Sequence, residues 1–209
     1  MKVLLLGATG GTGREIVRRA VAEGHSVVAL VRSILKANDL TGATLVEGDA
    51  RDEAALASAL EGCSGVISSL GTPMSPFSEV TLLSTATRSI VNVMTQKKIR
   101  RLVCITGLGA GDSRGHGGFV FDNFILPLLL RKVYEDKNRQ EDVIRSSSLD
   151  WVLVRPMVLN DNPGTGAVQA QTDLSKIHGG SVARSDVAKF VVDLLTDDKW
   201  LHRSPLIKG

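Results

Sequence analysis

Seven residues near the start of the chain, Gly7 to Gly13, constrain its fold more than any other feature. They read GATGGTG, which places glycines at a G-x-x-G-x-x-G spacing. A short aliphatic run, Lys2 to Leu6, precedes them. Apolar residues at helical spacing follow them, namely Ile16, Val17, Ala20 and Val21. A strand that turns into a helix through such glycines predicts the first unit of a dinucleotide-binding α/β fold.

Each glycine of this turn has its own structural task. The first permits the tight turn, the middle ones let the backbone approach a diphosphate, and the last lets helix and strand pack closely. Free N–H groups at the helix N-terminus then meet the phosphate charge. Glycines also punctuate strand–helix turns that bind nothing, and here the flanking strand and helix favour the binding site. We therefore expect cofactor contacts at Gly7, Thr9, Gly10, Gly11, Thr12 and Gly13.

The alternation of strand and helix continues along the chain. Aliphatic runs predict strands at 2–6, 26–31, 44–46, 65–70, 101–106 and 151–154. Helical spacing predicts helices at 12–23, 52–60 and 79–95, and a further helix ending near Ser147. Near-continuous apolar strands are typical of a parallel sheet covered on both faces. The sequence contains no Pro/Gly/Ser-rich linker and no repeat of solenoid period. Residues 1–209 are therefore predicted to form one Rossmann-type, doubly wound α/β domain.

Composition excludes several classes of partner. The net charge is +3, but the 25 Lys and Arg residues are spread along the chain and aromatic residues make up only 4%, which argues against nucleic-acid binding. The longest apolar stretch, Phe119 to Leu130, is interrupted by Asp122, Asn123 and Pro127 and is too short to cross a bilayer. We expect it to be a buried or pocket-lining helix, with no membrane partner. The chain moves from Met1 directly into a strand, so no signal peptide is expected and a cytoplasmic location follows.

The sequence indicates neither a metal site nor the catalytic site of a nucleophilic hydrolase. The two cysteines, Cys63 and Cys104, have no partner at metal-ligand or redox spacing, and we expect both to be reduced, packed side chains. The four histidines lie at scattered positions, 25, 116, 178 and 202. A Ser-His-Asp hydrolase would need a nucleophile elbow that the chain lacks. No metal site is predicted.

The end of the second predicted strand indicates which dinucleotide is bound. NAD-specific folds carry an acidic residue there, about 20 positions beyond the turn, which bonds the ribose hydroxyls. This chain has Arg32 at that place, followed by Ser33. An arginine would pair with a 2′-phosphate, helped by Ser33 and by Arg14 or Lys36. NADP(H) is therefore the preferred cofactor, with NAD(H) possible, and the alternative is that Arg32 is a solvated loop charge.

Further motifs give the chain a family resemblance. With Gly48-Asp49-Ala50 after the third strand and Leu70-Gly71-Thr72 after the fourth, it resembles the atypical short-chain dehydrogenase/reductase family, and within it the small flavin-reductase and biliverdin-reductase branch. The resemblance extends through Leu149-Asp150-Trp151, Arg155-Pro156 and Ser185-Asp186-Val187-Ala188. It implies that the Asp49 carboxylate accepts from the adenine amino group. It implies further cofactor contacts at Ala50, Leu70, Gly71 and Thr72, and a nicotinamide border at Pro156, Met157 and Val158.

The catalytic residues of that superfamily are only partly present. They are a hydroxyl at the end of the fifth strand and a Tyr-x-x-x-Lys helix, in which the lysine lowers the pKa of the tyrosine. Lys137 matches the lysine, but Val133 occupies the tyrosine's place and Tyr134 is one position off, a rotation of about 100° on a helix. We expect Tyr134 to pack or face solvent. Thr106 and Lys137 remain the candidate catalytic and cofactor-contacting pair, unless the Thr106 hydroxyl is satisfied by backbone.

Without the tyrosine acid, alcohol dehydrogenation is disfavoured. Reduction of an extended π-system needs less from the protein, because the cofactor carries the hydride step. The chain is therefore predicted to be an NADPH-dependent reductase of a flavin, quinone or related planar acceptor. Val158 replaces a histidine of the biliverdin reductase, so the resemblance gives no pigment specificity. The alternatives are a non-catalytic NADP(H)-sensing regulatory module that acts through a protein partner and, less favoured, a sugar-nucleotide epimerase.

The acceptor is expected to bind between two regions, 107–130 and 156–182. An acceptor could stack on the apolar residues Phe119, Phe121, Phe124, Ile125 and Leu126, which could equally form core or a subunit contact. Arg114 and His116 could meet an acidic group of the acceptor, or be solvated. The Gly- and Asn-rich stretch from Asn160 to Gly180 is a candidate lid. Whether the protein is a monomer or a homodimer stays open.

Overall fold

Eight strands of the described residues form one central sheet in the order β3-β2-β1-β4-β5-β6-β10-β8. The computed structural model describes residues 1–72, 79–116, 121–175 and 179–209. All pairings in the sheet are parallel except that of β8 with β10. The strands are β1 (Lys2–Leu6), β2 (Ser26–Val31), β3 (Ala43–Glu47), β4 (Gly65–Ser68), β5 (Arg101–Ile105), β6 (Asp150–Pro156), β8 (Gln169–Gln171) and β10 (Leu206–Lys208). A separate parallel pair consists of β7 (Val158–Asn160) and β9 (Ser181–Ala183).

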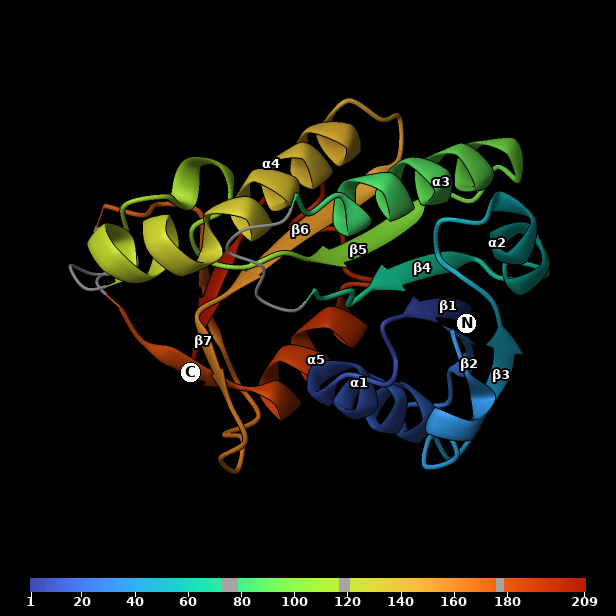
Figure 1. The fold of residues 1–209 in the computed structure, drawn as a ribbon. Coiled ribbons are helices and arrows are strands. Elements are labelled where there is room, and N and C mark those ends of the chain that lie inside the picture. Colours follow the sequence, from blue (N-terminus) through green and yellow to red (C-terminus); the bar gives the residue numbers. More distant parts are fainter. Residues whose placement is uncertain (73–78, 117–120, 176–178) are drawn as a thin grey trace.

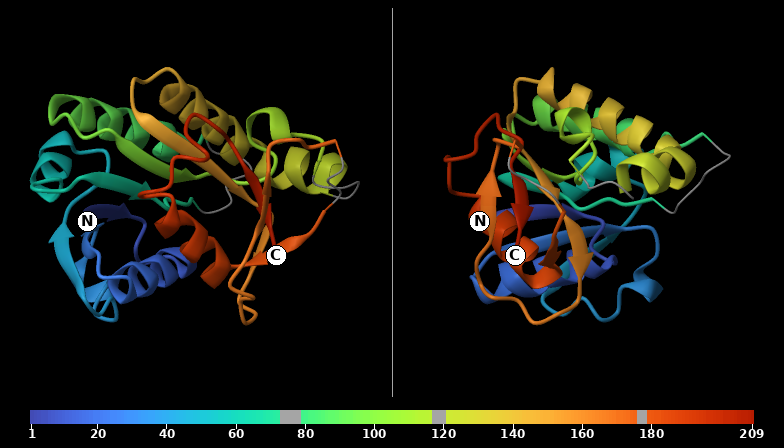
Figure 2. Two further views of the ribbon diagram at one scale, coloured as in Figure 1. Left: turned by 180° about the vertical axis from the view of Figure 1, so that it is seen from behind. Right: turned by 90° about the vertical axis from the view of Figure 1, so that its left-hand side faces the viewer.

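Helices cover the sheet on both faces, as Figures 1 and 2 show. The helices are α1 (Gly11–Ala22), α2 (Glu53–Ala59), α3 (Leu82–Gln96), α4 (Arg131–Arg145) and α5 (Arg184–Asp193). Short 3-10 turns occupy Ile34–Lys36 and Gly111–Ser113, and a π-helix occupies Phe121–Leu130. Helices α1 and α5 lie together on one face, while α2, α3 and α4 lie on the other (Figure 1).

Successive residues of β1 divide the core into two halves. Val3 and Leu5 pack with α1 and α5, whereas Leu4 and Leu6 pack with α2, α3 and α4. All four side chains are fully buried, because neighbouring side chains of a strand point to opposite faces and both faces are covered. Burial of an aliphatic side chain of this size stabilises the fold by about 1.5–3 kcal/mol. The continuous apolar run therefore places β1 at the centre of a three-layer fold, and the predicted fold class is confirmed.

Most of the predicted elements are present, and the differences are concentrated near the C-terminus. The predicted strands 2–6 and 26–31 have the observed bounds of β1 and β2. The candidate lid, 160–180, contains the strand β8, which the sequence did not indicate, and neither did it indicate β7, β9 or β10. These are three-residue strands, and β8 reads Gln-Ala-Gln, with no apolar run. Such strands are set by hydrogen bonds to distant neighbours rather than by local pattern.

Residues 121–130 of the apolar stretch before α4 are helical, but most of the side chains described there are not buried. Leu126 is buried, whereas Phe124 is 52% exposed and Leu128 is 67% exposed. The expectation of burial is therefore wrong for most of the side chains that the structure describes here, which include exposed Ile125 and Leu129. Phe119 lies outside the described residues. The alternatives of a ligand surface or a subunit contact stay open.

The expectations about cysteines agree with the structure. Cys63 and Cys104 are both free and buried. Burial raises the pKa of the Cys104 thiol to about 12, which keeps it protonated and unreactive. Among the described residues, no cluster of three potential metal ligands is found. No helix in the described part of the chain is both long enough and apolar enough to span a membrane.

Candidate functional site

A cavity of about 560 Å³ opens at the carboxyl ends of the four strands β3, β2, β1 and β4. In open parallel sheets, ligands bind in the crevice where the strand order reverses, and here the reversal lies between β1 and β4. Many of the predicted cofactor residues line this cavity. They are Gly7, Thr9, Gly10, Arg32, Asp49, Ala50, Leu70, Gly71 and Thr72. The remaining lining residues are Ala8, Leu30, Val31, Gly48, Arg51, Ser69 and Leu82.

The glycine turn is shaped by close backbone approaches. Gly7 has φ +79°, and a β-carbon built on it would lie 2.3 Å from the carbonyl oxygen of Ser69. A β-carbon on Gly13 would lie 2.1 Å from the carbonyl oxygen of Gly7. The helix N-cap, Gly10, provides no side-chain cap, and the first turn of α1 holds no acidic residue. The turn is therefore a bare cradle of main-chain amides, which fits a diphosphate.

Gly11, Thr12 and Gly13 stand at the start of α1 and are not among the residues that line the cavity. Thr12 and Gly13 are buried, and for Gly13 this agrees with the expected close packing of helix and strand. The cofactor contact expected of Thr12 stays a prediction. Arg14 pairs with Asp39, with Nε 2.7 Å from Oδ2, and neither residue lines the cavity. Ser33 and Lys36, the other expected helpers of Arg32, are also outside the lining.

The end of the cavity at β2 and β3 is rich in arginine. Arg51 binds Asp49 through two of its nitrogens, with Nε 2.9 Å from Oδ1 and Nη2 2.7 Å from Oδ2. This bond, with the nearby charge of Arg32, lowers the pKa of Asp49 to about 2. No carboxylate of the described residues forms an ion pair with Arg32. The cavity thus offers positive charge where an NAD-specific site would offer an acid.

Sequence reasoning missed Arg51, although a signal for it existed. Strands β2 and β3 pair in parallel, with Val31 opposite Glu47, so the residues that follow both strands meet at one edge. Arg51 follows Gly48-Asp49-Ala50 directly and could have been placed beside Arg32 by that rule.

A second group of polar residues lies at the end of β5. The Lys137 ammonium donates to the carbonyl oxygen of Thr106, and the Thr106 hydroxyl donates to Oε1 of Glu141 at 2.8 Å. Burial lowers the pKa of Lys137 to about 8. The expected alternative for Thr106 was a backbone partner, and its hydroxyl instead has a side-chain partner. Thr106 and Lys137 are therefore neighbours, and their roles toward a cofactor stay predictions.

Tyr134 packs beside Lys137. Its hydroxyl donates to the carbonyl oxygen of Leu108 at 2.7 Å, and its ring centroid lies 5.1 Å from the Lys137 Nζ. Burial raises the pKa of the phenol to about 12. The shift of one position does not separate the two side chains, because residues three apart also share a helix face. The high pKa and the bond to Leu108 still make Tyr134 a poor acid.

Glu141, which accepts from the Thr106 hydroxyl, also belongs to a buried ion pair. Arg155 donates to both carboxylate oxygens of Glu141, at 3.0 and 2.6 Å, and both residues are 1% exposed. Arg155 also pairs with Asp112 of the Gly111–Ser113 turn. The network joins α4, β6 and the loop after β5, and thereby fixes the segment that carries Thr106.

The residues expected to border the nicotinamide lie where β6 ends at Pro156 and β7 begins at Val158. The amide of Leu108 donates to the carbonyl oxygen of Pro156 at 3.1 Å, which brings this segment beside the end of β5. Met157 is buried, whereas Val158 is 63% exposed. None of these residues lines the cavity at the glycine turn.

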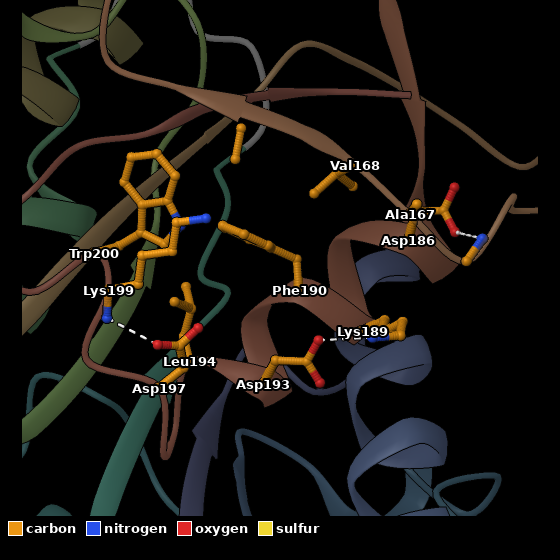
Figure 3. Close-up of a pocket in the computed structure, with 12 residues that line it drawn as sticks. Ala167, Val168, Asp186, Lys189, Phe190, Asp193, Leu194, Asp197, Lys199 and Trp200 are labelled. Carbon is orange, nitrogen blue, oxygen red and sulfur yellow. Dashed lines mark hydrogen bonds and ion pairs between the residues drawn. The ribbon is translucent and has the colours of Figure 1, made fainter.

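Another cavity, of about 390 Å³, lies beside α5 (Figure 3). Phe190 and Trp200 line it together with several charged residues. Lys189 pairs with Asp193 at 2.8 Å, so its charge is already balanced. This cavity is lined by none of the predicted cofactor residues.

Comparison with known proteins agrees with this geometry. Residues 7–198 match the family model described as NAD(P)H-binding. The sugar epimerase YhfK of Bacillus subtilis, itself described as uncharacterized, is 29% identical over 98% of this chain and 92% of its own. The structure of ChuY, an anaerobillin reductase from Escherichia coli, is 26% identical, covers 100% of this chain and 97% of its own, and has a TM-score of 0.83. A short-chain dehydrogenase/reductase from Veillonella parvula, solved in complex with NADP, shares the fold at 16% identity and a TM-score of 0.81, over 100% of this chain and 94% of its own. The chain therefore belongs to the NAD(P)H-binding family.

Proposed function

We propose that this protein is an NADPH-dependent reductase of a flavin, quinone or related planar acceptor. Two features together carry the proposal. A glycine-lined cavity suits a dinucleotide, and the Tyr134 hydroxyl donates to the carbonyl oxygen of Leu108 instead of serving as an acid. When bound, the nicotinamide supplies the hydride that reduces the acceptor, and solvent supplies the proton. The protein binds, orients and excludes water, which suits an acceptor that needs no side-chain acid.

The preference for NADPH rests on Arg32. Arg32 lines the cavity, and the neighbouring charge of Arg51 is balanced by Asp49. A 2′-phosphate is the group that would pair with Arg32 and that NADH lacks.

Arg32→Ala is expected to raise the Kd for NADPH about 10- to 100-fold, the effect of losing one or two charge-assisted hydrogen bonds, and to leave the Kd for NADH within about twofold. Fluorescence titration with both cofactors measures this. Arg18→Ala is the matched control, since Arg18 is an exposed α1 arginine paired with Glu15. An equal loss for NADPH and NADH would remove the argument for NADP specificity.

We place the acceptor between residues 107–130 and 156–182. Support comes from the exposed apolar side chains Phe124, Leu128 and Leu129 of the π-helix, because an apolar ligand would remove them from water. The likeness to an anaerobillin reductase also favours an extended π-system. NADPH oxidation, followed by its absorbance after addition of FMN, a quinone or an open-chain tetrapyrrole, tests the proposal. No turnover with any planar acceptor would defeat it.

Lys137 is expected to make cofactor binding depend on pH. Its pKa of about 8 is below the ordinary value, so the ammonium is present below about pH 8 and is lost as the pH rises above it. If this charge holds the nicotinamide ribose, the wild-type Kd for NADPH rises above pH 8. Lys137→Arg should remove that rise, because arginine stays charged. Titration of both proteins from about pH 7 to about pH 10 checks this, and identical profiles would contradict it.

A second candidate function is a non-catalytic NADP(H) sensor. The bond of Tyr134 to Leu108 and the exposed Phe124 and Leu128 favour it, since the same surface could hold a protein partner. This function predicts tight dinucleotide binding without oxidation of NADPH, and a partner whose affinity changes with the cofactor. Equal partner binding with and without NADPH would exclude it.

A further inference from the structure

Arg184, the first residue of α5, lies against the glycine turn. A β-carbon built on Gly11 would lie 2.9 Å from Nε and 3.1 Å from Cδ of Arg184. Helices α1 and α5 pack side by side (Figure 1), and their apolar faces share one core cluster. This packing holds the start of α5 beside the start of α1. A distant part of the chain therefore delivers a guanidinium to the turn.

The position is electrostatically unusual for a cation. The N-terminus of a helix carries partial positive charge, which repels a guanidinium and attracts an anion. The first turn of α1 has no acidic residue that could offset this charge. Arg184 pairs instead with Asp161, with Nη1 2.8 Å from Oδ1. Asp161 is 85% exposed, and ion pairs with so exposed a partner contribute little to stability.

We propose that Arg184 is a cofactor-binding residue whose guanidinium pairs with the diphosphate at the Gly10–Gly11 turn, and that Asp161 holds this guanidinium in the absence of the cofactor. The inference rests on the dinucleotide site proposed above. A diphosphate carries more charge than one carboxylate, and it would also contact the main-chain amides at the start of α1. It is therefore a better partner for the Arg184 guanidinium than Asp161 is. Asp161 then competes with the cofactor for Arg184.

The competition predicts effects of opposite sign. Arg184→Met keeps the alkyl stem that covers Gly11 and removes the charge, and it should raise the Kd for NADPH at least about tenfold. Asp161→Asn removes the competitor and should lower that Kd, by about two- to fivefold. The double variant should match Arg184→Met, because Asp161 acts only through Arg184. Lys189→Met is the control, since Lys189 stands on the same helix, pairs with Asp193 and is expected to leave the Kd unchanged.

Calorimetry with NADPH and with adenosine 2′,5′-bisphosphate, which lacks a diphosphate, locates the contact. Arg184→Met should weaken NADPH binding and spare the bisphosphate. If the Arg184→Met variant folds poorly, the lower Kd for NADPH expected of Asp161→Asn still tests the inference. A folded Arg184→Met variant with the wild-type Kd for NADPH would overturn the inference and leave the proposed function intact. An Asp161→Asn variant with an unchanged Kd for NADPH would do the same. Wild-type protein that binds neither NADPH nor NADH overturns the proposed function and the inference with it.

Discussion

Replacing Gly13 with alanine is expected to lower the free energy of unfolding by about 3 kcal/mol and to abolish measurable cofactor binding. The new β-carbon would lie 2.1 Å from the carbonyl oxygen of Gly7 and 2.8 Å from the Cα of Ala8. Both atoms belong to the backbone, so no side chain can move aside and α1 must shift away from the end of β1. Urea denaturation measures the first effect, and titration with NADPH measures the second.

Gly71→Ala is the control for stability. A β-carbon on Gly71 would meet nothing within 4 Å, and the position has no positive φ. Its free energy of unfolding should therefore stay within about 0.5 kcal/mol of wild type. Equal stability of the Gly13 and Gly71 variants would show that the close approach at Gly13 does not shape the turn.

Glu141→Ala is expected to cost about 3–5 kcal/mol of stability, the usual effect of removing one partner of a buried ion pair. Arg155 is 1% exposed and would keep its charge with only Asp112, which is on the surface, to balance it. The Thr106 hydroxyl would lose its acceptor at the same time. Chemical denaturation followed by circular dichroism measures the loss.

Glu135→Ala supplies the comparison for Glu141. Glu135 stands on the same helix and pairs with Arg131 at 2.8 Å, but this pair is exposed. Its loss should change stability by less than about 1 kcal/mol. A Glu141 variant no less stable than the Glu135 variant would mean that the buried pair does not hold α4, β6 and the loop after β5 together.

The first half of the site could be predicted from sequence because its residues follow strands directly. Gly7, Arg32 and Asp49 come at or just after the ends of β1, β2 and β3, and parallel neighbours bring such positions to one edge. The short strands after β6 could not be predicted, since β8 is polar and pairs with β10, 35 or more residues away in the chain. The residue pattern within and around β8 does not indicate that it pairs with β10.

The sequence by itself determined the α/β class, the glycine cradle and the positive charge at Arg32, because each depends on residue type and short-range order. Tertiary packing alone decided where Tyr134 donates, that Glu141 and Arg155 form a buried pair, and that Arg184 reaches Gly11. Those contacts join residues from separate elements. Their distances depend on how helices pack across the sheet, which no local spacing specifies.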